Sequence, residues 1–164
     1  MNLPHFRGYC QRVTHLERKF GVSLAAIFGM NCQTILVVED DAYIRESLVE
    51  ILRMEGFAAC SVPNGEEAFS FLGKMKQPVL VLLDMNMPVI SGWEFLARRE
   101  KHSSLKQHPV VIVSAVPDHH ALLNEGNMLK AEGLLSKPIQ IENLLKVAQQ
   151  YCIPQTELLA DQAG

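Results

Sequence analysis

The strongest constraint on the fold of this chain is a regular alternation of short apolar runs with longer amphipathic segments. A strand that is joined through a helix to a neighbouring parallel strand makes a right-handed crossover, so helices come to cover both faces of the sheet. The sequence therefore predicts an α/β fold built on a doubly wound, five-stranded parallel sheet. The five expected strands are Ile35–Val38, Phe57–Val62, Val79–Leu83, Val110–Val113 and Gly133–Ser136.

Helical patterns with recognisable ends fill the gaps between these runs. Asn64 with Glu67, and Ser91 with Glu94, have the spacing of helix capping pairs. Five strands alternating with five helices favour the flavodoxin-like strand order 2-1-3-4-5, a (βα)5 arrangement. The expected helices are marked by Ile44 to Leu52 before Gly56, by the two capping pairs, by Asp118 to about Leu129, and by Ile141 to Tyr151.

The length of 164 residues leaves room for one domain with a full hydrophobic core. We expect this domain to span residues 34–153, followed by a solvated tail at 154–164. Residues 1–33 differ in composition from the rest of the chain. A basic segment precedes an apolar run that is too short for a membrane span and has no cleavage site after it. We interpret them as an N-terminal extension, either a short helix at His15–Phe28 or a frayed segment, and Met30 is an alternative start.

Charge and cysteine content exclude several classes of function. The formal net charge is −3 and the pI is about 6.1, so the clustered basic surface of a nucleic-acid-binding protein is not expected. The four cysteines have no CxxC spacing, which argues against a zinc site and against a disulfide scaffold. With reduced thiols and no membrane span, we expect a cytoplasmic protein.

Charged and polar residues stand where four of the expected strands end. Asp84 directly follows the third run, in the stretch VLVLLDMNMPVISG. The carboxyl ends of parallel strands meet along one edge of the sheet, where ligands bind in open α/β sheets. The residues delivered to this edge are Glu39, Asp40 and Asp41 after the first strand, Asp84 after the third, Ser114 after the fourth and Lys137 after the fifth.

Three or four carboxylates gathered at one edge predict a bound cation. Carboxylates held together repel one another, and Mg²⁺ suits them because it binds through one or two carboxylates and keeps sites for water and phosphate. With the positive charge of Lys137, this set suits attack by an aspartate on a phosphoryl group, which gives an acyl phosphate. Each residue taken alone is more often structural, as a helix cap, a backbone partner or a surface ion pair. The whole set at one edge instead favours a functional site.

Four short motifs resemble those of the response-regulator receiver domain. They are ILVVEDD at 35–41, LLDMNMP at 82–88 with Gly92 beyond, VIVSA at 111–115 and SKP at 136–138. The resemblance covers about Thr34 to Ile153 and keeps the order and approximate spacing of the family. It implies a CheY-like fold and a place in a two-component or phosphorelay signalling system. Because no output domain follows Ile153, we expect a stand-alone, single-domain response regulator.

The resemblance also implies a role for each residue at the strand ends. Asp84 would accept the phosphoryl group and contribute to the metal site. Asp40 would bind Mg²⁺ directly, and Glu39, at a position that is usually Asp, would act through a metal-bound water. The remaining roles fall to the backbone carbonyl of Asn86 as a metal ligand, to Ser114 as the hydroxyl that holds the phosphoryl group, and to Lys137 as the cation that pairs with it.

The sequence departs from the family at one position that matters for signalling. Leu134 stands where the family usually carries Tyr or Phe, so the aromatic switch of the family is absent. Asn86 and Val116 occupy two variable positions that tune the phosphoryl lifetime in the family. His119 and His120 lack the spacing of a metal site.

The leading hypothesis is Mg²⁺-dependent transfer of a phosphoryl group from a phosphohistidine to Asp84. The donor would be a histidine kinase or a histidine phosphotransfer protein, and the product would bind a downstream target protein differently. Such a chain catalyses its own phosphotransfer and slow dephosphorylation, so we expect a signalling protein rather than a metabolic enzyme. The alternatives are a docking module that works without phosphorylation and an aspartyl phosphohydrolase, which would require an acid in place of Asn86.

Overall fold

The computed structural model describes residues 32–115 and 131–154 of the chain. The predicted strands lie within two residues of the observed ones at each end. The helix expected from Asp118 to about Leu129, and the one expected at His15–Phe28, lie outside the described residues. The elements in chain order are β1 (Thr34–Val38), α3 (Ala42–Met54), β2 (Ala59–Val62), α4 (Gly65–Leu72), β3 (Val79–Asp84), α5 (Gly92–Lys101), the 3₁₀ turn η1 (Ser103–Leu105), β4 (Val110–Ser114), β5 (Gly133–Ser136) and α7 (Ile141–Tyr151).

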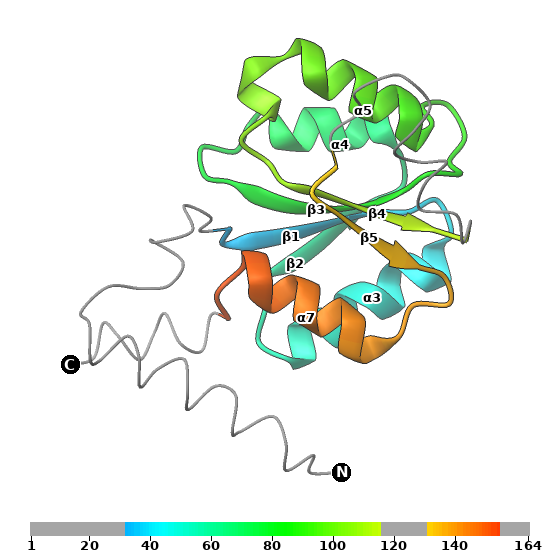
Figure 1. Cartoon of the computed structure of the whole chain (residues 1–164), viewed down its shortest axis with the longest axis vertical. Helices are drawn as coiled ribbons and strands as arrows, with labels where there is room; N and C mark the ends of the chain where they lie inside the picture. The colour runs from blue at the N-terminus through cyan, green and yellow to red at the C-terminus, as the bar shows by residue number, and fades with distance from the viewer. Residues whose placement is uncertain (1–31, 116–130, 155–164) are drawn as a thin grey trace, which may run out of the picture.

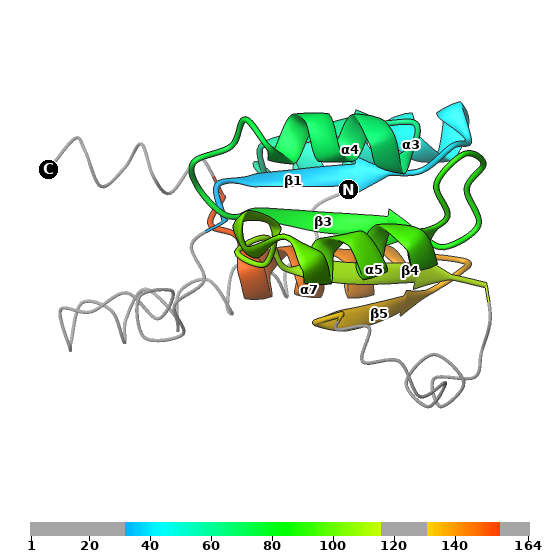
Figure 2. The ribbon, with the colours of Figure 1, turned by 90° about the horizontal axis from the view of Figure 1, so that it is seen from above.

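The strands form one parallel sheet in the order β2-β1-β3-β4-β5. The predicted doubly wound sheet and its strand order are therefore confirmed. Helices α4 and α5 cover one face of the sheet, and α3 and α7 cover the other (Figures 1 and 2). Because the strands run the same way, the carboxyl ends of β1, β3, β4 and β5 share one edge.

Side-chain caps and a glycine fix where the helices begin and end. The side chain of Asn64 accepts a hydrogen bond from Glu67 N at 2.9 Å, and Ser91 Oγ accepts one from Glu94 N at 3.2 Å, so both predicted capping pairs are confirmed. Gly56 follows α3 with φ 88°, in the left-handed region that favours glycine. None of the helices in the described ranges combines the length and the hydropathy needed to cross a bilayer.

Apolar clusters fill the space between the sheet and the helices on both faces. Successive side chains of β1 point to opposite faces, so Ile35 and Val37 pack with α3 and α7, whereas Leu36 and Val38 pack with α4 and α5. Strand β3 is buried along its whole length, as is typical of a central strand in a parallel sheet. Each fully buried Val or Leu stabilises the fold by about 1.5–3 kcal/mol, so β3 anchors the position of Asp84.

An ion pair made by a buried arginine lies at the opposite end of the sheet, where the strands begin. Arg99 of α5 donates hydrogen bonds to Glu132 Oε1 at 2.7 Å and to the carbonyl of His108 at 2.9 Å. Glu132 also accepts a hydrogen bond from Val110 N at 2.6 Å, and His108 Nδ1 accepts one from Val79 N at 3.0 Å. These contacts tie α5 to the first residues of β3 and β4 and to the residue before β5.

We expect acid to destabilise the fold through His108. Burial, and then the nearby Arg99 guanidinium, lower the pKa of His108 below its ordinary value of 6.5. As the pH falls below 6.5, the unfolded chain takes up a proton that the folded chain does not. The free energy of unfolding should therefore fall with pH, by up to about 1.4 kcal/mol per pH unit, as measured by urea unfolding.

A pair of variants isolates this effect. His108→Asn keeps a side-chain acceptor for Val79 N and removes the titrating group, so its free energy of unfolding should vary less with pH than that of the wild type. His102→Asn removes an exposed histidine at the end of α5 and should keep the wild-type pH dependence. Identical pH dependence in His108→Asn and in the wild type would contradict the assignment.

Candidate functional site

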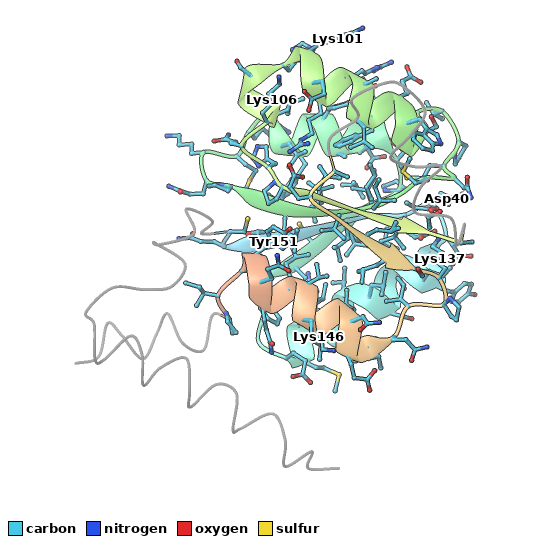
Figure 3. All side chains as sticks on the ribbon, in the orientation of Figure 1. Asp40, Lys101, Lys106, Lys137, Lys146 and Tyr151 are labelled. Atoms are coloured by element: carbon cyan, nitrogen blue, oxygen red, sulfur yellow. The ribbon has the colours of Figure 1, made fainter. Side chains whose placement is uncertain are left out.

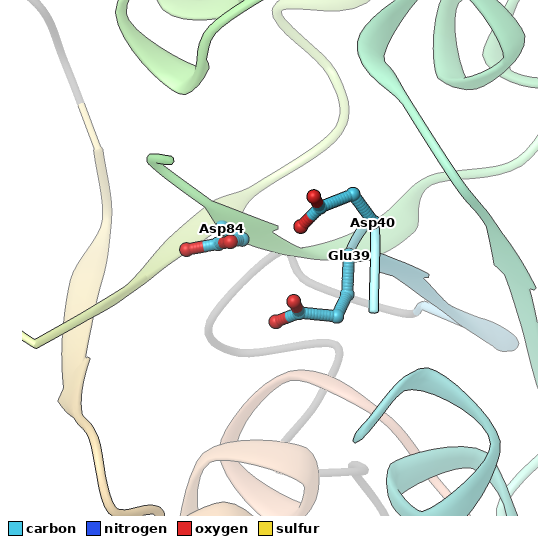
Figure 4. A group of neighbouring side chains, drawn as sticks. All are labelled: Glu39, Asp40 and Asp84. Carbon is cyan, nitrogen blue, oxygen red and sulfur yellow. The ribbon is translucent and has the colours of Figure 1, made fainter. Parts of the chain in front are cut away.

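Three carboxylates meet at the edge of the sheet where the strands end. Glu39 and Asp40 follow β1, Asp84 ends β3, and each offers an oxygen within 4.8 Å of the others. Their carboxylates converge on one space (Figure 4). Glu39 and Asp84 are only 3% and 4% exposed, whereas Asp40 is exposed. Two carboxylates are thus withdrawn from water, which costs free energy unless cations compensate for it.

Main-chain contacts hold Asp84 at this edge. Asp84 is the last residue of β3 and pairs with Val113 of β4. Asn86 N donates a hydrogen bond to Asp84 Oδ1 at 3.3 Å. A Cβ at Gly92 would lie 2.7 Å from the carbonyl oxygen of Asp84, so a glycine is needed for α5 to begin so close to the site.

Asp41 lies beside the cluster and has a different role. Its Oδ1 accepts hydrogen bonds from Tyr43 N at 2.9 Å and Ile44 N at 3.0 Å, so it is the N-cap of α3. A short polar side chain at this position satisfies N–H groups of the first helical turn. Of the three or four acids expected at this edge, the structure therefore brings together three.

Lys137 brings a positive charge into the same space from the end of β5. Its Nζ donates a hydrogen bond to Glu39 Oε2 at 2.8 Å and lies 3.3 Å from Asp84 Oδ1. Its main-chain N donates to the carbonyl of Ser114 at 2.8 Å, which fixes it beside β4. Asp40 and Lys137 lie at the same end of the sheet (Figure 3). One ammonium group cannot balance three carboxylates, so the cluster keeps an excess of negative charge.

Burial and pairing have opposite effects on the pKa values of Glu39 and Lys137. Burial raises the pKa of Glu39 above its ordinary value of 4.5, because it outweighs the hydrogen bond from Lys137. Burial on its own would lower the pKa of Lys137, but the hydrogen bond with Glu39 and the charge of Asp84 outweigh it, so the pKa is raised. A further positive charge in the site would therefore favour the ionised form of Glu39.

A second cation, Arg45, holds the loop that carries two of the acids. Its Nη1 donates hydrogen bonds to the carbonyl oxygens of Glu39 at 2.8 Å and Asp40 at 3.1 Å. Arg45 was not among the site residues predicted from the sequence. The position of Arg45 in the sequence could have indicated its role. It lies near the start of α3, where the helix dipole disfavours a cation unless acceptors hold it.

The other predicted site residues lie at the expected edge or outside the described ranges. Ser114 ends β4 and is 1% exposed, and Asn86 is exposed two residues beyond Asp84; the roles assigned to them stay predictions. Leu134 of β5 is partly buried against the cluster beneath α4 and α5. The residues outside the described ranges are Val116, His119 and His120.

The donor set of the cluster suits a hard divalent cation. Among the described side chains, the group consists of the carboxylates of Glu39, Asp40 and Asp84. Mg²⁺ takes oxygen ligands, needs one or two carboxylates from the protein and keeps several waters. Because Asp40 is exposed, the cluster is open to solvent on one side. The residues present therefore fit Mg²⁺, with room for water or a phosphate oxygen.

Comparisons with known proteins find relatives over most of the described chain. Residues 35–149 match the family model of the response regulator receiver domain. A two-component response regulator of Oryza sativa subsp. indica is 33% identical over 122 residues, which cover 73% of this chain and 80% of that protein. A 3',5'-cyclic-nucleotide phosphodiesterase of Dictyostelium discoideum is 34% identical over 113 residues, but the match spans 68% of this chain and 14% of that protein. The solved structure of the chemotaxis protein CheY4 of Vibrio cholerae has a TM-score of 0.64 at 30% identity and covers 73% of this chain and 98% of its own.

We expect Glu39→Gln to stabilise the metal-free protein at neutral pH. Because the fold raises the pKa of Glu39 above 4.5, the free energy of unfolding falls as the pH rises from that value through the folded-state pKa. Glutamine resembles the protonated acid and avoids this loss, which is about 1.4 kcal/mol for each unit of pKa difference. Urea unfolding in the presence of a chelator measures the gain.

The gain should disappear below pH 4.5, where Glu39 is protonated in both states. Glu50→Gln, which changes an exposed acid of α3, is the matched control and should show no comparable gain. A Glu39→Gln protein that is no more stable than the wild type at neutral pH would show that the buried charge carries no such cost.

Proposed function

The chain belongs to the response-regulator receiver family of two-component signalling systems, and from this premise we propose that Asp84 accepts a phosphoryl group from a phosphohistidine. Phosphorylation-dependent signalling is the standard function of the family. The observation that carries the proposal is the placement of Asp84, a strand-end carboxylate that is 4% exposed and lies 3.3 Å from Lys137 Nζ. This pairing places a cation beside the carboxylate that would attack an incoming phosphoryl group.

The contacts of Asp84 distinguish its two oxygens. Asn86 N and Lys137 Nζ both approach Oδ1, so we propose that Oδ2 attacks the phosphorus. The new P–O bond forms as the P–N bond to the donor imidazole breaks, and the imidazole nitrogen leaves with the electron pair. Lys137 then pairs with one oxygen of the transferred group, and the hydroxyl of Ser114 donates a hydrogen bond to another.

The proposed metal ligands are Glu39, Asp40, Asp84 and the backbone carbonyl of Asn86. When bound, Mg²⁺ supplies positive charge beside the transferring phosphoryl group. The carboxylate oxygens within 4.8 Å of one another support this assignment, as does the raised pKa of Glu39. Glu39 is longer than the Asp usual at its position, which suits contact through a metal-bound water.

The surface around the site offers apolar side chains to a partner protein. Receiver domains interact with histidine kinases and with downstream targets, and we propose that a histidine kinase or histidine phosphotransfer protein docks here. Tyr43, Val89 and Ile141 are 85%, 84% and 50% exposed, and they follow the ends of β1, β3 and β5. Val89 has φ 70°, and such strain in a β-branched residue is concentrated at functional sites.

The proposed role is cytoplasmic signalling, with self-catalysed phosphotransfer and slow dephosphorylation, rather than metabolic catalysis. Two points support it. The chain belongs to a signalling family, and the residue proposed to attack, Asp84, would itself keep the phosphoryl group. The phosphodiesterase relative lends no support to hydrolysis of cyclic nucleotides, because the match spans 14% of that protein.

Acetyl phosphate with Mg²⁺ should phosphorylate the wild type, because Asp84 lies beside Lys137 and the acids that would hold the ion. The product is a hydroxylamine-sensitive mass increase of one phosphoryl group, measured by intact-mass spectrometry. Asp84→Asn should show none, whereas Asp41→Asn should be phosphorylated normally, because asparagine preserves the cap of α3. A folded wild type that gains no phosphoryl group would leave a phosphorylation-independent docking module as the function.

Removing Arg45 should weaken Mg²⁺ binding, because its guanidinium holds the carbonyl oxygens of Glu39 and Asp40. Losing hydrogen bonds from a charged donor predicts about a tenfold higher dissociation constant for Arg45→Met, measured by calorimetric titration. Arg53→Met is the matched control, because Arg53 Nε also donates to a carbonyl, that of Ala59 at 2.9 Å, but at the far end of α3. Equal affinities in the two variants would rule out a positioning role for Arg45.

Tyr43→Ala should slow phosphotransfer from a protein donor, because it removes an exposed aromatic side chain beside the site. For an anchoring aromatic residue we expect a loss of about tenfold or more in the transfer rate from a phosphorylated histidine phosphotransfer protein. The rate with acetyl phosphate, which needs no docking surface, should not change. Met54→Ala, which alters a residue that is 79% exposed at the other end of α3, should leave both rates unchanged, and a matching loss there would refute the proposed surface.

A further inference from the structure

Two cysteines pair at the end of the sheet opposite the acidic site. Cys32 precedes β1, Cys152 follows α7, and the two form an isolated parallel bridge. Cys32 N donates a hydrogen bond to the carbonyl of Tyr151 at 3.1 Å. The cysteines are 1% and 5% exposed within the cluster that packs with α3 and α7. Tyr151, the residue before Cys152, lies at the far end of the sheet from Lys137 (Figure 3).

The bridge holds the two thiols within reach of a disulfide. The main chains of directly paired parallel segments lie about 4.8 Å apart, and disulfides join Cα atoms that are roughly 4.4–6.8 Å apart. The two thiols are also hydrogen-bonded to each other, which lowers the pKa of Cys32 and raises that of Cys152. Cys32 is therefore the thiol that ionises first, and Cys152 keeps its proton. Cys60 has a different contact, with its Sγ 3.9 Å from the carbonyl oxygen of Ile35.

The position of the pair also provides a route for a small oxidant. Both cysteines lie just outside the regular elements, since β1 begins at Thr34 and α7 ends at Tyr151. An isolated bridge at the end of an element opens at a lower free energy than the strands and helices of the core. Local opening thus exposes these thiols without unfolding the sheet.

We propose that Cys32 and Cys152 form an oxidation site, at which a hydroperoxide joins the segment before β1 to the segment after α7 by a disulfide. The cross-link would close a loop of chain that contains every described strand of the sheet. Because it closes a long loop, it restricts the unfolded chain strongly and should raise the resistance of the domain to unfolding.

The reaction balances with one hydrogen peroxide for two thiols. The Cys32 thiolate attacks one peroxide oxygen, the O–O bond breaks, and Cys32 sulfenic acid and one water form once a proton is taken up. The sulfur of Cys152 then attacks the sulfur of Cys32, and the displaced hydroxide leaves as water with the thiol proton of Cys152. The two cysteines are oxidised and the peroxide is reduced.

The test treats the folded, full-length chain with hydrogen peroxide, alkylates the remaining thiols and maps the peptides without reduction. The expected product is one linked pair that contains residues 32 and 152 and is lost on treatment with dithiothreitol. The oxidised chain should melt at a higher temperature than the reduced chain. Cys60→Ala is the matched control and should keep the linked pair, whereas Cys152→Ala should lose it.

Other products would overturn the proposal. Linkage of Cys32 or Cys152 to another cysteine, linkage between two chains, or sulfinic acid at either position without a disulfide would each do so. The same holds if both thiols stay unmodified at a peroxide concentration that oxidises Cys60, or if the linked chain melts no higher than the reduced one. Mapping of the wild type does not depend on the folding of any variant.

Discussion

The interaction on which the site depends is the burial of two carboxylates, Glu39 and Asp84, against the ammonium group of Lys137. Each of the three comes from the end of a different strand, so the contact forms only when β1, β3 and β5 are assembled in one sheet. Burying two carboxylates against one ammonium group leaves the charges unbalanced. The pKa of Glu39 is raised because its burial outweighs the hydrogen bond from Lys137. A cation bound here would reduce the cost of burying the two carboxylates.

The remainder of the domain holds these groups in place. The fully buried β3 positions Asp84, and Gly92 lets α5 begin against its main chain. Arg45 fixes the loop after β1 through main-chain carbonyls, so the acid side chains stay available for a ligand. Contacts at the opposite end, around Arg99, secure the same strands where they begin and do not draw on the residues of the site.

Local patterns in the sequence predicted the strands and both capping pairs, because these features depend on residues close together in the chain. The order of the strands followed from their alternation with helices, which favours a doubly wound sheet. The convergence of Glu39, Asp84 and Lys137 was also predictable, since parallel strands must end along one edge. Contacts that join distant residues without a periodic signal were not predictable. The pairing of Arg99 with Glu132 and of Cys32 with Cys152 depends on how α5 and α7 pack. The role of Asp41 was ambiguous for a local reason, because an acid before a helix serves as a cap or as a ligand, and only the position of its side chain decides.

The central claim is that the acidic cluster carries an uncompensated negative charge that a divalent cation relieves. The most direct test is the melting temperature of the wild type and of Asp84→Asn at increasing MgCl₂, with ionic strength held constant by NaCl. A ligand that binds the folded state raises stability with the logarithm of its concentration. Mg²⁺ should raise the melting temperature of the wild type clearly more than that of Asp84→Asn. A melting temperature of the wild type that does not change with Mg²⁺ would contradict it.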